Sequence, residues 1–366
     1  MSSPAISERK LPRENASELV VRAAADNELA AWDRIVTRFP NCRVFHRLAW
    51  CRSVSSGRVR AVYLIVESDG EIVAALPGFL RHLGPLRLFA SPLEGTQTES
   101  MGPVFDPERV RGADVVRACV AYLERQYRVH HIEIVSRDLE APEMTAMGFR
   151  PHSQFTYRAA LHPDSADLGF AALNSKTRNL VRKGMKSGVT VTHESGDGFI
   201  HEMYTQSAAV FRRRGNAMPF REERFRRCAE ALRECGCLLA LAARSPEGTC
   251  IATGLFAADG RELILWMWTH VFEHRNLSPT EIMTWTAMEY AAAQGCTVFD
   301  MTGGGEAKRK FGGTADEKTL RWIRSRYAWL GTARLAAFKV YRWQQRLRGR
   351  ISRLSARSTA PAAAEE

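Results

Sequence analysis

The stretch CLLALAARSPEGTCIATGLFAADGRELILWMWTHV, residues 237–271, decides the fold of this chain. Turn residues at Pro246–Gly248 and Asp259-Gly260 divide it into three apolar runs, a pattern that predicts three strands in an antiparallel meander. Residues 280–294 then have helical character and end at a glycine, and TVFDMT (297–302) predicts a further strand. Meander, helix and strand together indicate one mixed α/β unit.

The first half of the chain has the same order of elements. AVYLIVESDGEIVAALPGFL (61–80) contains two apolar runs joined by Ser68-Asp69-Gly70, a strong hairpin signal. Residues 107–127 carry apolar side chains at helical spacing, HHIEIVS (130–136) predicts a strand, and FTYRAAL (155–161) is expected to close the unit. We therefore predict a mixed α/β (α+β) fold that contains the same unit twice.

This order predicts two tandem domains, 18–161 and 162–325, the second with the main catalytic motifs. A basic amphipathic helix is expected at 326–357 and a disordered tail at 358–366. The basic helix fits an anionic membrane surface through residues 334–354, and packing of its apolar stripe against the body of the protein is the alternative.

Composition and charge exclude several classes of protein. Of the 366 residues, 45% are hydrophobic and 25% charged, which excludes wholesale disorder. The apolar runs are far shorter than the roughly 18 to 20 residues of a membrane span, and no secretory signal is visible, so we expect a cytoplasmic protein, peripheral at the inner membrane face if its basic helix binds there. The net charge of +12 comes almost entirely from the C-terminal end, because residues 321–357 contain eleven Lys or Arg and no Asp or Glu. The eight cysteines lack the spacing of a metal site, so we expect reduced thiols and no metal.

Two segments of the second half have the residue types of an anion site. Arg178, Arg182, Lys183 and Lys186 are spaced so that several share a helix face, where like charges repel unless an anion lies between them. A solvated helix face is the alternative. The run Arg275-Asn276-Leu277-Ser278-Pro279-Thr280 precedes a helix whose N-terminus suits a pyrophosphate, with Arg275, Ser278 and Thr280 as cofactor-binding candidates. The structural alternative is that Ser278 caps the helix and Pro279 is its first residue, which explains the same sequence without a cofactor.

A third segment, FDMTGGGEAKRKFGG (299–313), places three glycines between Asp300 and Lys310. A flexible loop beside a lysine is suited to meeting a developing oxyanion with a cation. Asp300 is a candidate base at a strand end, and a cap for the following turn is its alternative role; Glu306 and His270 are further candidates.

These segments together resemble the FemAB-like branch of the GNAT superfamily, which includes peptidoglycan-bridge aminoacyltransferases and acetyltransferases associated with polysaccharide synthesis. The resemblance spans about residues 18–325 and is strongest in the second half. The residues that carry it are Arg178 to Val189, Pro219-Phe220, Arg275 to Thr280 with Trp285, Phe299-Asp300, Lys310-Phe311-Gly312, Phe45-His46 with Trp50, and Leu76-Pro77.

The resemblance implies two tandem GNAT-like domains that hold substrate in a cleft between them and transfer an acyl or aminoacyl group to an amine. It also implies that Lys310 lies at the reaction centre, where it would stabilise negative charge while Arg178, Arg182, Lys183 and Lys186 hold a phosphate. Our first hypothesis is transfer from acyl-CoA to an amine of a sugar or of a cell-envelope or exopolysaccharide precursor. The alternatives are an aminoacyl-tRNA-dependent aminoacyltransferase of the peptidoglycan-bridge type and a non-catalytic GNAT-like binding scaffold. The basic segments suit tRNA but lack interleaved aromatic residues.

Overall fold

The computed structural model describes residues 18–334, 336, 339–340, 343–344 and 347. The predicted tail at 358–366 and much of the predicted basic helix at 326–357 lie outside this part of the chain. Residues 328–334 are helical, and Val340, Trp343 and Leu347 are exposed. Binding of this segment to a membrane surface stays a prediction. Within the described residues, no helix combines the length and the apolar character that crossing a bilayer requires.

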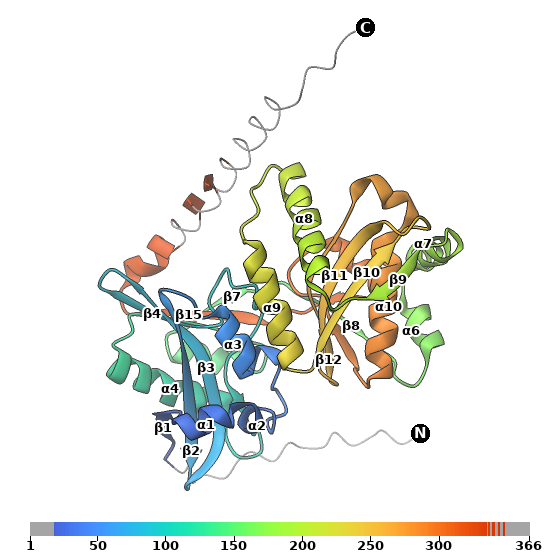
Figure 1. The fold of residues 1–366 in the computed structure, drawn as a ribbon. Helices are drawn as coiled ribbons and strands as arrows, with labels where there is room; N and C mark the ends of the chain where they lie inside the picture. Colours follow the sequence, from blue (N-terminus) through green and yellow to red (C-terminus); the bar gives the residue numbers. More distant parts are fainter. Residues whose placement is uncertain (1–17, 335, 337–338, 341–342, 345–346, 348–366) are drawn as a thin grey trace, which may run out of the picture. The chain divides into compact units, whose positions relative to one another are not determined.

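The first sheet contains eight strands among the described residues, in the order β1-β2-β3-β4-β6-β15-β7, with β5 paired to β3 (Figure 1). Its strands are β1 Val20–Ala23, β2 Val59–Ser68, β3 Glu71–Leu83, β4 Leu86–Ser91, β5 Val104–Phe105, β6 His131–Ser136, β7 Arg150–Ser153 and β15 Leu320–Ser325. The helices of this part of the chain are α1 Asp26–Ala30, α2 Trp32–Val36, α3 Leu48–Val54, α4 Gly112–Tyr127 and α5 Ala141–Ala146. α2 packs on the sheet through Trp32 and Val36, which share a buried cluster with Ile65 and Ala75.

The second sheet contains seven strands among the described residues, in the order β14-β8-β13-β12-β11-β10-β9. Its strands are β8 Tyr157–Ala160, β9 Thr190–His193, β10 Leu238–Arg244, β11 Cys250–Ala258, β12 Glu262–His270, β13 Val298–Asp300 and β14 Thr314–Ala315. Its helices are α6 Ala166–Ala172, α7 Ser175–Lys186, α8 Asp197–Arg213, α9 Glu222–Glu234 and α10 Pro279–Ala293, with 3₁₀ turns η2 Phe272–Leu277 and η3 Glu306–Phe311. α8 and α9 cover one face of this sheet, and α10 covers the other, with α6 and α7 packed beside it (Figure 1).

The two sheets confirm the predicted repetition of one mixed α/β unit. In the first, β2, β3 and β4 form an antiparallel meander, α4 follows, and β6 pairs parallel to β4. In the second, β10, β11 and β12 form the meander, α10 follows, and β13 pairs parallel to β12. The predicted meander of residues 237–271 is therefore confirmed, as is the helix that follows it.

Two strands lie in a different sheet from the one that chain order suggests. FTYRAAL was expected to close the first unit, but its strand β8 lies in the second sheet, paired with β13 and β14. β15 lies in the first sheet, beside β6. Buried ion pairs stabilise both placements, because Arg158 on β8 bonds Asp300 on β13, and Arg321 on β15 bonds Glu133 on β6. The described residues accordingly form two compact units, one of residues 18–48, 55–152 and 321–324 and one of the rest.

Candidate active site

The N-terminus of α10 brings together residues from three separate segments. β12 ends at His270, η2 leads to Ser278, and Pro279 is the first helical residue. Ser278 is 2% exposed and adopts a left-handed φ of 56°. It occupies the cap position as the structural alternative predicted, but its side chain makes no capping hydrogen bond. The backbone turn, rather than a serine cap, therefore starts this helix.

Lys310 reaches this helix from η3 and pairs with a residue that the sequence did not single out. Its Nζ donates to Glu281 Oε1 at 2.7 Å, and Glu281 lies in the first turn of α10. The side chains are 26% and 13% exposed, so the ion pair is partly withdrawn from water. Phe311, fully buried, packs its ring 5.6 Å from that of Trp268 and fixes the end of η3. The lysine is thus held on a rigid support with one side open to solvent.

His270 belongs to the same cluster. Its Nδ1 lies 3.3 Å from Thr280 Oγ1. Burial lowers the pKa of His270; the Lys310 cation lowers it further, while the Glu281 carboxylate opposes both. A neutral imidazole beside an ammonium is a group that can accept a proton. His270, Thr280 and Lys310, three of the candidates from the sequence, therefore gather around Glu281.

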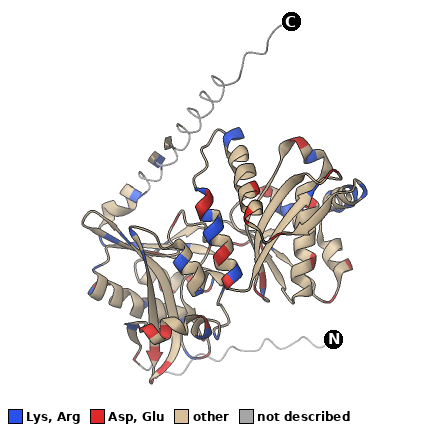
Figure 2. Ribbon diagram, in the orientation of Figure 1, with Lys and Arg blue, Asp and Glu red and all other residues tan. Residues whose placement is uncertain are grey.

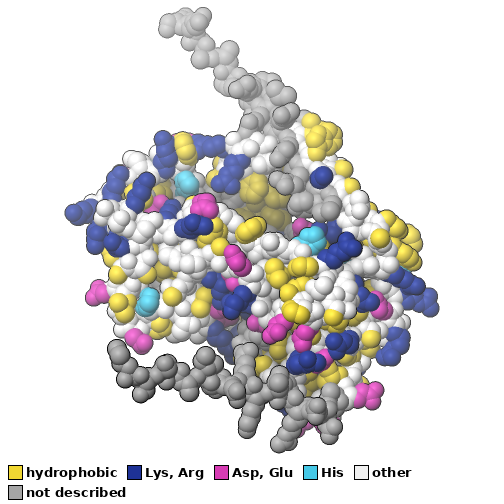
Figure 3. All heavy atoms as spheres, turned by 180° about the vertical axis from the view of Figure 1, so that it is seen from behind, with side chains coloured by type: hydrophobic (Ala, Val, Ile, Leu, Met, Phe, Trp, Pro, Cys, Tyr) yellow, Lys and Arg dark blue, Asp and Glu magenta, His cyan; other side chains and the backbone are white. Residues whose placement is uncertain are grey.

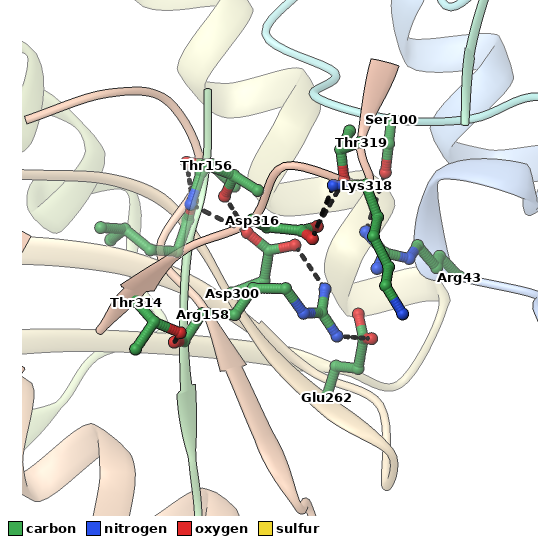
Figure 4. Close-up of polar contacts among 12 residues, drawn as sticks. Arg43, Ser100, Thr156, Arg158, Glu262, Asp300, Thr314, Asp316, Lys318 and Thr319 are labelled. Atoms are coloured by element: carbon green, nitrogen blue, oxygen red, sulfur yellow. Dashed lines mark hydrogen bonds and ion pairs between the residues drawn. The ribbon is translucent and has the colours of Figure 1, made fainter. Parts of the chain in front are cut away.

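Asp300 has a different environment. Figure 4 shows its carboxylate between Thr156, whose Oγ1 donates to Oδ1 at 2.5 Å, and Arg158, whose Nη1 donates to Oδ2 at 2.8 Å. The backbone N–H of Thr302 also donates to Oδ1 at 3.0 Å. Arg158 extends to Glu262 as well, at 2.5 Å, so one guanidinium joins β8, β13 and β12. With 3% of Asp300 exposed, this geometry favours the turn-capping and strand-joining role over that of a base.

The glycine-rich loop folds around Lys308. Its Nζ donates to the carbonyl oxygens of Met301 at 2.7 Å and Gly303 at 2.9 Å, and also to that of Thr302. Gly303 and Gly305 adopt φ values of 60° and 143°, which favour glycine. Glu306, in contrast, is 77% exposed and pairs with its neighbour Arg309 at 3.1 Å. Lys308 thus holds the loop that presents Lys310.

The basic residues of α7 divide into two groups. Arg178 Nη1 donates to the carbonyls of Ala171 and Leu173 at 2.9 and 2.5 Å, and so caps the end of α6. The guanidinium of Arg182 lies 5.0 Å above the ring of Phe170. Lys183 and Lys186 are exposed. Figure 2 shows the basic colouring of α7, and basic side chains also gather on its side of the molecule when seen from behind (Figure 3). Of the four residues predicted to hold a phosphate, Arg182, Lys183 and Lys186 are exposed. The Arg178 guanidinium is instead bonded to backbone carbonyls, and phosphate binding by this helix stays a prediction.

Arg275 contacts the α10 N-terminus through its backbone, because its carbonyl accepts from the N–H of Ser278 at 3.2 Å. Its guanidinium lies 3.9 Å above the ring of Phe272, and Nη1 donates to the Phe272 carbonyl at 3.3 Å. Its role as a cofactor-binding residue stays a prediction.

Comparison with known proteins agrees with the fold described above. Residues 171–311 match the family model described as an acetyltransferase (GNAT) domain. No curated protein matches the chain in sequence. Among solved structures, FemX is 16% identical with a TM-score of 0.69, over 84% of this chain and 97% of FemX. A tandem GNAT protein from the clavulanic acid biosynthesis pathway is 13% identical with a TM-score of 0.53, over 85% and 99%.

A third similar structure is the C-terminal domain of a protein assigned as a lysylphosphatidylglycerol synthetase from Agrobacterium fabrum. It is 13% identical with a TM-score of 0.54, over 86% of this chain and 96% of that one. The structural similarity establishes the fold, and at identities this low it leaves the substrates open. Residues 171–311 thus match an acetyltransferase (GNAT) domain, and over most of its length the chain has the fold of FemX and of the tandem GNAT protein.

Proposed function

We propose that this protein is an aminoacyltransferase that moves an aminoacyl group from a charged tRNA to an amine of a cell-envelope precursor. The observation that carries the proposal is the ion pair between Glu281, in the first turn of α10, and Lys310, in η3. The FemX-like fold, and the similarity to a protein whose assigned name couples lysine to a lipid, support the aminoacyl class.

The first turn of α10 is unfavourable for the pyrophosphate of coenzyme A. Pro279 has no N–H to donate, and Glu281 adds a carboxylate beside the remaining N–H groups. A pyrophosphate at that position would face a negative charge at close range, and the lysine that could offset it is already paired. A donor that presents only an ester carbonyl avoids this repulsion.

The cluster supplies the elements of acyl transfer. The acceptor nitrogen attacks the ester carbonyl, the C–N bond forms, and the C–O bond to the ribose breaks. His270, kept neutral by its low pKa, takes the proton of the attacking amine, directly or through water. The Lys310 ammonium stabilises the oxyanion, and Glu281 orients that ammonium. The proton finally passes to the departing ribose oxygen.

Transfer from acyl-CoA is the second candidate, and the GNAT domain match over residues 171–311 favours it. Parallel strands β12 and β13 with α10 between them in the chain also form the arrangement expected of that domain. In this case the amine of a sugar or exopolysaccharide precursor is the expected acceptor.

A donor competition assay tests the proposal. The full chain is incubated with an amine-bearing peptidoglycan precursor and either a mixture of radiolabelled aminoacyl-tRNAs or labelled acetyl-CoA. We expect label to pass from tRNA to the precursor, and to stay on tRNA with a Lys310→Met variant. Transfer from acetyl-CoA with none from any charged tRNA would replace the proposal by the second candidate. Transfer from neither donor, with the precursor still bound, would favour the scaffold hypothesis.

A further inference from the structure

A hollow of about 490 Å³ lies in the first unit, and none of the candidate active-site residues lines it. Its lining residues come from the turn before β2, from β2, β3 and β4, and from the last turn of α4. Four of its lining residues are basic and none is acidic. The basic residues are Arg58, Arg60, His82 and Arg87.

Strand register places three of these basic residues on one face of the sheet. Arg60 pairs with Leu80 across β2 and β3, and His82 pairs with Arg87 across β3 and β4. Because side chains alternate along a strand, Leu80 and His82 face the same side. Arg60, His82 and Arg87 therefore share one face of the sheet, where their side chains can converge on an anion. Arg58 lies in the turn before β2 and lines the same hollow.

Two of the three arginines are held in place by contacts with Tyr127. Arg87 Nη1 donates to the Tyr127 carbonyl at 3.1 Å, and the backbone N–H of Arg87 donates to His130 Nδ1, also at 3.1 Å. The Arg60 guanidinium lies 5.6 Å above the ring of Tyr127. Only Gly84 and Pro85 separate the paired ends of β3 and β4, which keeps the hairpin short. Side chains fixed in this way lose little entropy when a ligand binds.

No carboxylate neutralises this group in the part of the chain that the structure describes. The acidic residue nearest in sequence to Tyr127, Glu124, pairs instead with Arg324 at 3.2 Å. Arg58, Arg60 and Arg87 form no ion pair with a described residue. Three guanidinium groups offer planar donor pairs that match phosphate oxygens, while Leu80 and Tyr127 provide an apolar wall for the organic part of a ligand.

We propose that this hollow binds the diphosphate group of an organic ligand, either soluble or lipid-linked. The inference stands apart from the proposed aminoacyl transfer, because it uses residues of the first unit alone. Three arginines fit more than one phosphate, and a volume of about 490 Å³ admits a diphosphate with part of its ester group.

Calorimetric titration of the full chain with inorganic pyrophosphate and with uridine diphosphate, at constant ionic strength, tests the proposal. Arg58→Gln and Arg60→Gln are each expected to weaken binding about tenfold. Arg81→Gln is the matched control, because Arg81 lies on β3 between Leu80 and His82, is exposed, and faces the other side of the sheet. It is expected to change the Kd by less than about twofold.

A second control separates this hollow from the basic face of α7. Lys183→Gln removes one exposed charge from α7, whose basic residues are predicted to hold a phosphate. Pyrophosphate binding that is weakened more by Arg60→Gln than by Lys183→Gln assigns the anion to the hollow. Loss of binding with Lys183→Gln but not with Arg60→Gln would overturn the assignment. Equal losses of diphosphate affinity in Arg60→Gln and Arg81→Gln would also overturn it. The same holds if the chain binds neither diphosphate and does not bind the vesicles described next.

Vesicles distinguish the two sources of the diphosphate. Phosphatidylcholine vesicles with and without a polyprenyl diphosphate are sedimented with the wild-type chain and with Arg60→Gln. Retention that needs both the diphosphate lipid and Arg60 assigns the site to a lipid-linked ligand. Binding of uridine diphosphate without vesicle retention assigns it to a soluble one. Vesicle retention that Arg60→Gln does not reduce, with no binding of the soluble diphosphates, would overturn the proposal.

Discussion

Glu281 holds its carboxylate oxygen 2.7 Å from the ammonium of Lys310, across 29 residues of chain. The pair joins the first turn of α10 to the end of the glycine-rich loop. In a partly buried site such a pair fixes the position of the cation. The proposed reaction needs this, because the oxyanion forms at a fixed distance from its donor.

Removal of the lysine charge is expected to abolish most of the turnover. Lys310→Met should lower kcat by about 10²-fold or more, the usual effect of losing one oxyanion donor. Arg309→Gln removes a neighbouring charge that is 63% exposed and should change kcat by less than about twofold. Both rates are measured with the donor that the competition assay identifies. Equal effects of the two substitutions would show that only the net charge of the loop matters.

Glu281→Gln tests the argument about the donor. The amide keeps the shape of the side chain but removes the charge that repels a pyrophosphate from the α10 N-terminus. Coenzyme A should then bind about threefold to tenfold more tightly than to the wild-type chain, equivalent to about 1 kcal/mol. Calorimetry with coenzyme A measures the change. Weaker binding to Glu281→Gln would mean that the carboxylate assists the cofactor, which favours the acyl-CoA hypothesis.

The titration of His270 reports on the same cluster. Burial and the Lys310 cation both lower its pKa, so Lys310→Met should raise the pKa of His270 toward its ordinary value. Imidazole chemical shifts in a ¹⁵N-labelled chain, followed from pH 4 to 8, measure this directly and need no substrate. If the titration of His270 is unchanged in Lys310→Met, the Lys310 charge does not influence the His270 pKa, and His270 is removed from the proposed mechanism.

The fold could be predicted from sequence because its signals are local. The apolar runs of β10 to β12 are separated by turn residues, and their pairing follows from adjacency in the chain. The placement of β8 and β15 could not be predicted in this way, since it depends on the long-range ion pairs of Arg158 and Arg321. Periodicity contains no information about which sheet a short strand joins.

The site was predicted in part for a similar reason. Lys310, His270 and Thr280 lie in segments that motifs mark, whereas Glu281 looks like any acidic residue in the first turn of a helix. The sequence leaves two alternative roles open for Asp300. The contact that distinguishes them is with Arg158, which lies 142 residues away in sequence.

Acid should destabilise the chain through His46. Burial lowers the pKa of His46 from 6.5 to about 4, so the unfolded state binds more protons between these values. The stabilising effect of the neutral imidazole is fully present above pH 6.5 and is lost as the pH falls toward 4, by about 3 kcal/mol. Urea unfolding of wild type and His46→Gln at pH 7 and pH 4.5 measures the difference. The proposed linkage is excluded if both proteins lose the same stability.

The last prediction concerns Asp300 and Arg158. Arg158→Met removes the guanidinium that pairs with Asp300, which is 3% exposed, and with Glu262, which is partly buried. Because both carboxylates then lack their partner, the substitution should lower the free energy of unfolding by about 3 to 5 kcal/mol. Asp300→Asn keeps two of the three groups and should cost less. Per folded molecule, Asp300→Asn should retain turnover within about threefold of wild type, because its carboxylate joins strands and does not act as the base. A loss of turnover above about 10²-fold without a loss of stability would restore Asp300 to the catalytic role that its position at a strand end first suggested.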